Sequence, residues 1–222
     1  MNDQLTLVED NEVSLAPSIN AFEAYAKAVG GSSIVGRLLK FNKGDYYVDD
    51  KLFNDTQLIA NVDELLVGWV KWVDGRPAEQ LMGRVIDAFQ PKQRTELGDD
   101  DTSTWEVDAG GKPRDPWQLT NYLILKNKDS DDLYTYAPSS KGGLGAVGKL
   151  CGEYVKMMRK NPDIFPIVQL ESDSYLSKDK SVGRVKFPVL KVVGWAPKTG
   201  FSDAVDAAVE SAGDDLVAQT RF

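Results

Sequence analysis

The chain has 222 residues, of which 42% are hydrophobic and 27% are charged, and its formal net charge at pH 7 is −8. This composition suits one globular domain with extensions, and no apolar run approaches the ~20 residues that a membrane-spanning helix needs. The chain has no histidine, so the commonest general base and zinc ligand is missing, and its single cysteine excludes an internal disulfide. We therefore expect no metal site and no cofactor, although paired carboxylates that bind magnesium stay open. The first residues lack the basic region of a signal peptide, which favours the cytoplasm.

The negative charge is concentrated in three segments. Residues 1–24 carry five acids and no base, residues 96–108 six acids and no base, and residues 199–222 five acids and one arginine. The remainder has 25 basic and 18 acidic residues, a net charge of +7. Acidic extensions on a basic body fit a protein that binds a polyanion, and simple solubility is the alternative explanation.

The first part of the chain predicts an irregular start, one helix and then strands. Residues 1–17 are polar and are predicted to be flexible. A helix follows, with Asn20 as its cap and Gly30-Gly31 at its end, and it opens a single domain that we expect to span residues 18–198. Residues 33–41 and 46–48 have the pattern of a hairpin.

Residues 58–73 form the most apolar section, and their alternation places apolar side chains on both faces. This pattern predicts a central strand or a barrel wall. A further strand is expected over residues 80–88, with Gly83 as a bulge. Residues 89–116 are polar and acidic and predict a long insertion crossed by a short strand at 104–107.

The pattern is clearer from Trp117 onward. Residues 117–126 and 133–136 predict a second hairpin, and a helix follows from Ser139 until Asn161-Pro162 ends it. Strands are predicted at 167–170 and 183–195, and Pro188 indicates that the last one is an edge or bulged strand. Residues 199–222 are small and acidic, so we expect a mobile tail outside the fold.

The start of this second helix is rich in serine, lysine and glycine. Ser140, Lys141, Gly142 and Gly143 predict a phosphate-binding loop, because the first turn of a helix offers free N–H groups to an anion. The segment also contains two incomplete nucleotide-binding motifs. A P-loop formed by Gly143, Gly148 and Lys149 would need a hydroxyl residue where Leu150 stands. A dinucleotide fingerprint formed by Gly143, Gly145 and Gly148 is not accompanied by a run of βα units.

The other interpretation of these glycines is packing. We expect Gly148 and Gly152 to let a neighbouring strand come close to the helix, since neither carries a side chain.

The order of elements predicts a mainly β fold with helices, in the α+β class. Three strands, a helix and two strands is the order of an OB-fold, so we expect an OB-fold-like antiparallel barrel. The N-terminal helix is an addition, and the other helix lies between the third and the later strands. A plain antiparallel α+β domain stays as the alternative.

The chain also resembles single-stranded DNA-binding proteins of bacteriophages that are built on an OB-fold. The resemblance is carried by the strands with Tyr46, Tyr47, Trp69 and Trp72, by residues 117–136 and 139–160, by Gly183–Phe187, and by the acidic tail that ends in Phe222. It implies binding of single-stranded DNA without sequence specificity, in support of phage replication or recombination in the cytoplasm of a bacterial host. It also implies that the tail recruits replication or recombination proteins. In that family acids directly precede the final aromatic residue, whereas here Arg221 does.

We expect aromatic rings to stack on bases and cationic side chains to follow the phosphates. The predicted contact residues are those near turns and on one face of the last strand: Tyr46, Tyr47, Trp72, Lys126, Tyr134, Tyr136, Lys141, Arg184 and Lys186. For each tyrosine the alternative is a core position with the hydroxyl in water.

Two further functions stay open. One is a nucleotide- or dinucleotide-binding enzyme that uses residues 143–148, and the other is a module that binds only protein. The resemblance favours a binding protein that is not an enzyme.

Overall fold

The computed structural model describes residues 34–108, 110–178, 180, 183–199 and 201. The predicted flexible segment 1–17, the predicted N-terminal helix and residues 202–222 lie outside the described residues. The described residues form one helix, nine strands and two short 3-10 turns. The elements are β1 (Arg37–Asn42), β2 (Asp45–Val48), β3 (Lys51–Leu52), β4 (Gln57–Val73), β5 (Arg76–Arg84), η1 (Arg94–Glu96), η2 (Thr102–Thr104), β6 (Trp117–Asn127), β7 (Leu133–Tyr136), α2 (Lys141–Met158), β8 (Ile164–Leu176) and β9 (Arg184–Pro197).

All nine strands belong to one sheet, and β4 is its centre. The order is β3-β2-β1-β7-β6-β4-β8-β9, with β5 also paired to β4, and every pairing except β1–β7 is antiparallel. One edge of β4 pairs with β6, and the other pairs with β8 at Gln57–Ile59 and with β5 at Leu66–Val73. The prediction of a central strand from its two apolar faces is therefore confirmed.

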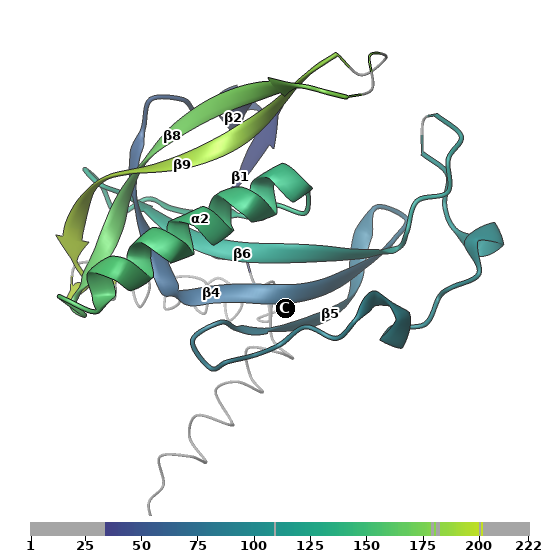
Figure 1. The fold of residues 1–222 in the computed structure, drawn as a ribbon, viewed down its shortest axis with the longest axis horizontal. Helices are drawn as coiled ribbons and strands as arrows, with labels where there is room; N and C mark the ends of the chain where they lie inside the picture. Colours follow the sequence, from purple (N-terminus) through teal and green to yellow (C-terminus); the bar gives the residue numbers. More distant parts are fainter. Residues whose placement is uncertain (1–33, 109, 179, 181–182, 200, 202–222) are drawn as a thin grey trace, which may run out of the picture. The chain divides into compact units, whose positions relative to one another are not determined.

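The sheet curls into a half-barrel that holds the core on its inner side (Figure 1). The hydroxyl of Tyr46 on β2 donates to the carbonyl oxygens of Glu171 on β8 and Val189 on β9, at 3.1 and 3.2 Å. Because β2 and β9 belong to opposite ends of the strand order, this buried side chain joins the two ends of the curl. The mainly β character predicted from the sequence is confirmed.

Helix α2 packs on the curled sheet through Val147, Leu150 and Tyr154. It begins as predicted, because the side chain of Ser140 caps it by accepting the N–H of Gly143 at 3.2 Å. The prediction that Gly148 and Gly152 face a packed neighbour is wrong, since a Cβ at either position would meet open space. The closely packed glycines are Gly143, against Pro138, and Gly142, where a Cβ would lie 3.0 Å from Cβ of Phe187.

The segment between β5 and β6 differs from the prediction in detail. Strand β5 begins earlier than expected, at Arg76, and Gly83 packs against Phe89 instead of forming a bulge. No strand forms at residues 104–107; η2 ends at Thr104, and Val107 makes one isolated bridge with Pro113. Local hydrogen bonds hold this part of the segment as a turn instead: the Nε1 group of Trp105 donates to the carbonyl of Asp99 at 2.7 Å, and the side chain of Asp101 accepts the N–H of Ser103 at 3.0 Å.

The folded body extends further along the chain than the predicted boundary at residue 198. Phe201 is only 1% exposed and packs edge-on against Phe165, with 5.7 Å between the ring centres. Its N–H donates to the carbonyl of Lys198 at 2.9 Å. The prediction that the mobile tail begins at residue 199 is therefore wrong, because an aromatic side chain beyond that point completes the core.

Buried tyrosines predict a loss of stability at alkaline pH. Burial raises the pKa of Tyr46 and Tyr136 well above the ordinary value of 10.0. Above pH ~10 the unfolded chain loses these protons while the folded chain keeps them, so the free energy of unfolding should fall by about 1.4 kcal/mol per pH unit for each tyrosine. Below pH ~10 both states are protonated and the two groups contribute no slope. Urea unfolding from pH 8 to 11 measures this slope, and Tyr136→Phe should reduce it. Equal slopes in the two proteins would contradict the prediction.

Candidate nucleic-acid interface

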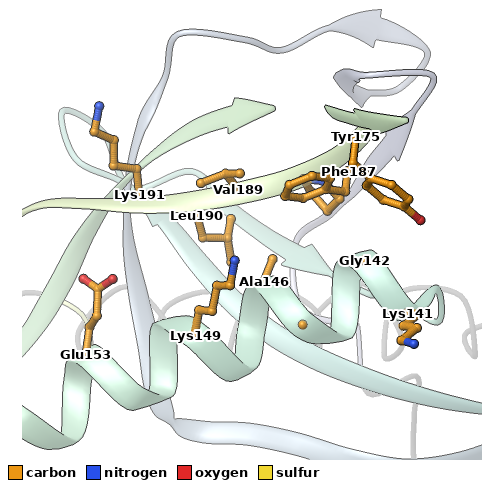
Figure 2. A pocket seen from close by; sticks show the side chains of 12 residues that line it. Lys141, Gly142, Ala146, Lys149, Glu153, Tyr175, Phe187, Val189, Leu190 and Lys191 are labelled. Carbon is orange, nitrogen blue, oxygen red and sulfur yellow. The ribbon is translucent and has the colours of Figure 1, made fainter. Parts of the chain in front are cut away.

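A groove lies between α2 and the edge strand β9, with a volume of about 530 Å³ (Figure 2). We call it the α2–β9 groove. It is defined by Lys141, Gly142, Gly145, Ala146, Lys149 and Glu153 of α2, by Phe187, Pro188, Val189, Leu190 and Lys191 of β9, and by Tyr175 of β8.

The groove exists because small residues occupy the helix wall. At Gly142 the helix and β9 are in contact, whereas a Cβ at Gly145 would meet nothing within 4 Å. The space therefore opens along the helix from its first turn onward. At about 1.5 Å per residue, the helix between Gly142 and Glu153 is about 16 Å long, so the groove has room for an extended ligand.

Two aromatic rings stand at the end of the groove near the start of α2. Tyr175 is 54% exposed, and its ring centre lies 6.1 Å from that of the half-buried Phe187. Figure 2 shows both rings near Gly142 at the first turn of α2, with Lys149 extending from the helix toward β9 and Lys141 directed away from the rings. The Nζ atom of Lys149 lies 5.9 Å from the centre of the Phe187 ring, which is a cation–π distance.

The two ends of the groove differ in charge. Neither Lys141 nor Lys149 forms a salt bridge with any residue that the structure describes, so both ammonium groups are available to a ligand. At the other end Lys191 pairs with Glu171 at 2.9 Å, and the carboxylate of Glu153 is exposed. An anion is therefore favoured in the half that contains Lys141 and Lys149.

The structure brings only part of the predicted phosphate-binding loop to this groove. Lys141 and Gly142 line it. Ser140 caps the helix, and Gly143 packs against Pro138 with its N–H already bonded to the Ser140 side chain. A full phosphate cradle over all four residues is not formed.

Three predicted stacking tyrosines are placed in the core, and their prediction is corrected. Tyr46, Tyr134 and Tyr136 are 1%, 1% and 2% exposed. Their rings cannot stack on a base in this structure, because other core side chains cover them. The hydroxyl of Tyr134 accepts a hydrogen bond from Arg37 at 2.9 Å.

The prediction for Lys126 is also corrected, because this residue is buried and already paired. It is 9% exposed, and its Nζ atom pairs with Asp131 at 2.9 Å, so its charge is already neutralised within the turn between β6 and β7. Tyr47 and Trp72 are half-buried and do not line the groove. The Nε1 group of Trp72 is buried without a hydrogen-bond partner in the described part of the chain, beside Pro116.

Arg184 and Lys186 are exposed on β9, but they occupy the opposite face from Phe187 because side chains alternate along a strand. Arg184 donates to the hydroxyl of Ser174 at 3.0 Å, and the Lys186 side chain covers Gly44. The two predicted cationic residues of β9 therefore lie together on the face opposite the Phe187 ring.

Sequence reasoning did not assign Tyr175, Phe187 or Lys149 to nucleic-acid contacts. A signal for Lys149 was present, because Gly142, Gly145 and Lys149 recur at helical spacing on one stripe. The pairing that places Tyr175 beside Phe187 comes from the β8–β9 register, in which Tyr175 faces Val185. That register was not predicted.

The acidic insertion is partly neutralised by its own contacts. Asp99 pairs with Lys71 at 2.9 Å and accepts the Nε1–H of Trp117 at 2.8 Å. These two hydrogen bonds, with Lys71 the stronger, hold the pKa of Asp99 below its usual range. Arg94 pairs with Asp115 at 2.7 Å. The insertion is therefore anchored to the sheet and offers less free negative charge than its composition suggests.

Comparison of the chain with protein-family models, curated proteins and solved structures gave no significant match. In the residues that the structure describes, no helix is long and apolar enough to cross a membrane. The same residues contain no cluster of three or more acidic or cysteine side chains placed to hold a metal ion.

Proposed function

We propose that the protein binds single-stranded DNA without strong sequence preference, through the α2–β9 groove. The observation that carries this proposal is the combination in one groove of two partly exposed aromatic rings and two lysines that have no carboxylate partner among the described residues. Single-stranded nucleic acid presents the matching chemistry, because its bases have open faces for stacking and its phosphates are regularly spaced anions.

In this proposal Tyr175 provides the main stacking surface, and Phe187 continues it into the groove. Lys141 and Lys149 are two helical turns apart and contact phosphates along one strand. In a duplex the base faces are covered by their neighbours, so a duplex could use the lysines but not the rings. This difference supports a preference for single strands.

We also propose that the fold is a modified OB-fold barrel. Strands β4, β6 and β7, then α2, then β8 and β9 follow the order of three strands, a helix and two strands. β4 pairs with both β6 and β8, and the β1–β2 hairpin fills the gap between β7 and β9 through Tyr46. Together with the resemblance to phage proteins, this arrangement supports a role in phage replication or recombination in the host cytoplasm. Recruitment of partner proteins by the acidic tail belongs to the same proposal.

The other functions have less support from the geometry. A dinucleotide-binding helix connects neighbouring parallel strands, but β7 and β8, which flank α2, are separated in the sheet by β6 and β4. We propose a binding protein rather than an enzyme for this reason. A peptide that added a strand to β9 would meet Pro188, which has no N–H to donate.

Oligonucleotide binding tests the proposal. Fluorescence anisotropy with a labelled single strand and the matching duplex should show tighter binding of the single strand, weakening as salt rises. Tyr175→Ala should weaken single-strand binding about 5- to 150-fold, because a base–aromatic stack contributes roughly 1–3 kcal/mol. Tyr175→Phe keeps the ring and should bind normally. Equal or tighter binding of the duplex, or no binding at low salt, would count against the proposal.

A further inference from the structure

We propose that the hollow beside Gly145 in the α2–β9 groove receives one unpaired nucleobase, and that the absence of a side chain at Gly145 is what admits it. This inference rests on the proposed binding of single-stranded DNA and specifies how that site recognises its ligand. It makes Gly145 a specificity-determining residue that selects unpaired over paired bases.

The space beside Gly145 has the size and walls that a planar base needs. A Cβ at this position would meet nothing within 4 Å, and the groove volume of about 530 Å³ lies within the ~300–1,000 Å³ range of small-molecule pockets. Ala146 lines the helix side, and Val189 and Leu190 line the strand side. These apolar walls favour the face of a base over a phosphate.

The charges on either side of the hollow orient such a ligand. Lys141 and Lys149 flank Gly145 at four residues on each side, so phosphates on both sides of an inserted base can reach a lysine. Glu153 stands beyond Lys149 and repels a phosphate.

Base insertion explains the preference for single strands without a sequence preference. In a duplex the Watson–Crick edge is engaged and the base is stacked between its neighbours, so entry would require the base to be flipped out at a cost. The free-energy cost is much smaller for an unpaired base, and any base that fits can enter.

A matched pair of glycine substitutions tests the inference. Gly145→Leu fills the hollow, whereas Gly148→Leu adds the same side chain to the same helix outside the groove, and both positions face open space. Both variants should fold and melt at the wild-type temperature or above, because leucine favours a helix more than glycine does. Gly145→Leu should weaken binding of a single-stranded oligonucleotide at least 10-fold, and Gly148→Leu less than 2-fold.

Oligonucleotides that keep every phosphate but carry abasic sites separate base insertion from phosphate binding. The wild-type protein should bind the abasic strand at least 10-fold more weakly than the normal strand, and Gly145→Leu should bind the two strands almost equally. If the wild-type protein binds normal single strands but Gly145→Leu behaves like Gly148→Leu, the inference that a base enters beside Gly145 is wrong and the proposed function stands. If the wild-type protein binds no oligonucleotide, both the function and the inference fail.

Discussion

Replacing Phe201 with alanine is expected to lower the free energy of unfolding by about 3–5 kcal/mol, the usual cost of truncating a fully buried phenylalanine. Phe201 is 1% exposed, and its ring meets Phe165, which in turn lies 6.3 Å from Tyr154 on α2. The substitution would leave a cavity where the chain after β9, the start of β8 and α2 meet. Chemical denaturation monitored by circular dichroism measures the change.

The neighbouring chain offers a control for this prediction. Thr199→Ala is two residues away and exposed, so its effect should stay within ~0.5 kcal/mol. Phe201→Leu keeps most of the apolar volume and should cost less than Phe201→Ala. A loss below 1 kcal/mol for Phe201→Ala would show that the core does not depend on this residue.

The contacts of Lys198 also show that the folded domain extends beyond Pro197. The Nζ atom of Lys198 lies 2.5 Å from one carboxylate oxygen of Asp63, and the Tyr154 hydroxyl donates to the other at 2.8 Å. Burial is the largest single influence and would lower the pKa of Lys198, but the hydrogen bonds and charge interactions with Asp63 and Tyr154 together outweigh it and raise the pKa. A chain that ended at Pro197 would lose both this ion pair and Phe201. Experiments on the acidic tail should therefore keep residues up to Phe201.

Reversing the charges of Lys141 and Lys149 in the groove is expected to weaken single-strand binding about 100- to 1,000-fold at low salt. Two unit charges at 4 Å in water interact by about 1 kcal/mol, so exchanging attraction for repulsion changes each site by about 2 kcal/mol. The variant is Lys141→Glu with Lys149→Glu, and fluorescence anisotropy over a salt series measures its affinity. The slope of log affinity against log salt should also become shallower by about 1.4, because each lost phosphate contact on a single strand contributes about 0.7.

Lys156→Glu with Lys160→Glu is the matched control for the groove variant. It changes the net charge by the same amount in the same part of the chain, but neither lysine lines the α2–β9 groove. The affinity of this control variant for the single strand should fall far less, because only long-range electrostatic repulsion is added. Salt screens that repulsion. Equal losses in the two variants would mean that net charge, and not the groove, governs binding.

Several elements were predictable from the sequence because local chemistry determines them. The helix was predicted to start at Ser139, next to its cap Ser140, and to end at Asn161-Pro162, because capping and proline effects act within a few residues. The two apolar faces of residues 58–73 required a strand with neighbours on both edges. Pro188 indicated an edge strand because it lacks an N–H, and β9 is at the end of the strand order.

The candidate binding surface depends on the tertiary structure. Alternation along a strand shows which side chains share a face, but it does not show which face another element covers. Tyr46 and Tyr175 are both tyrosines near turns, yet Tyr46 is 1% exposed because the sheet curls over it, while Tyr175 extends beyond the core and is 54% exposed. Gly143 and Gly145 differ in the same way. Gly143 is closely packed because Pro138 lies against it, whereas Gly145 borders the groove that α2 and β9 leave between them. Phe201 stands at the start of a small-residue and acidic segment that predicts a tail, yet it belongs to the core because its ring packs edge-on against Phe165. These outcomes depend on contacts between residues far apart in the chain, which no local pattern records.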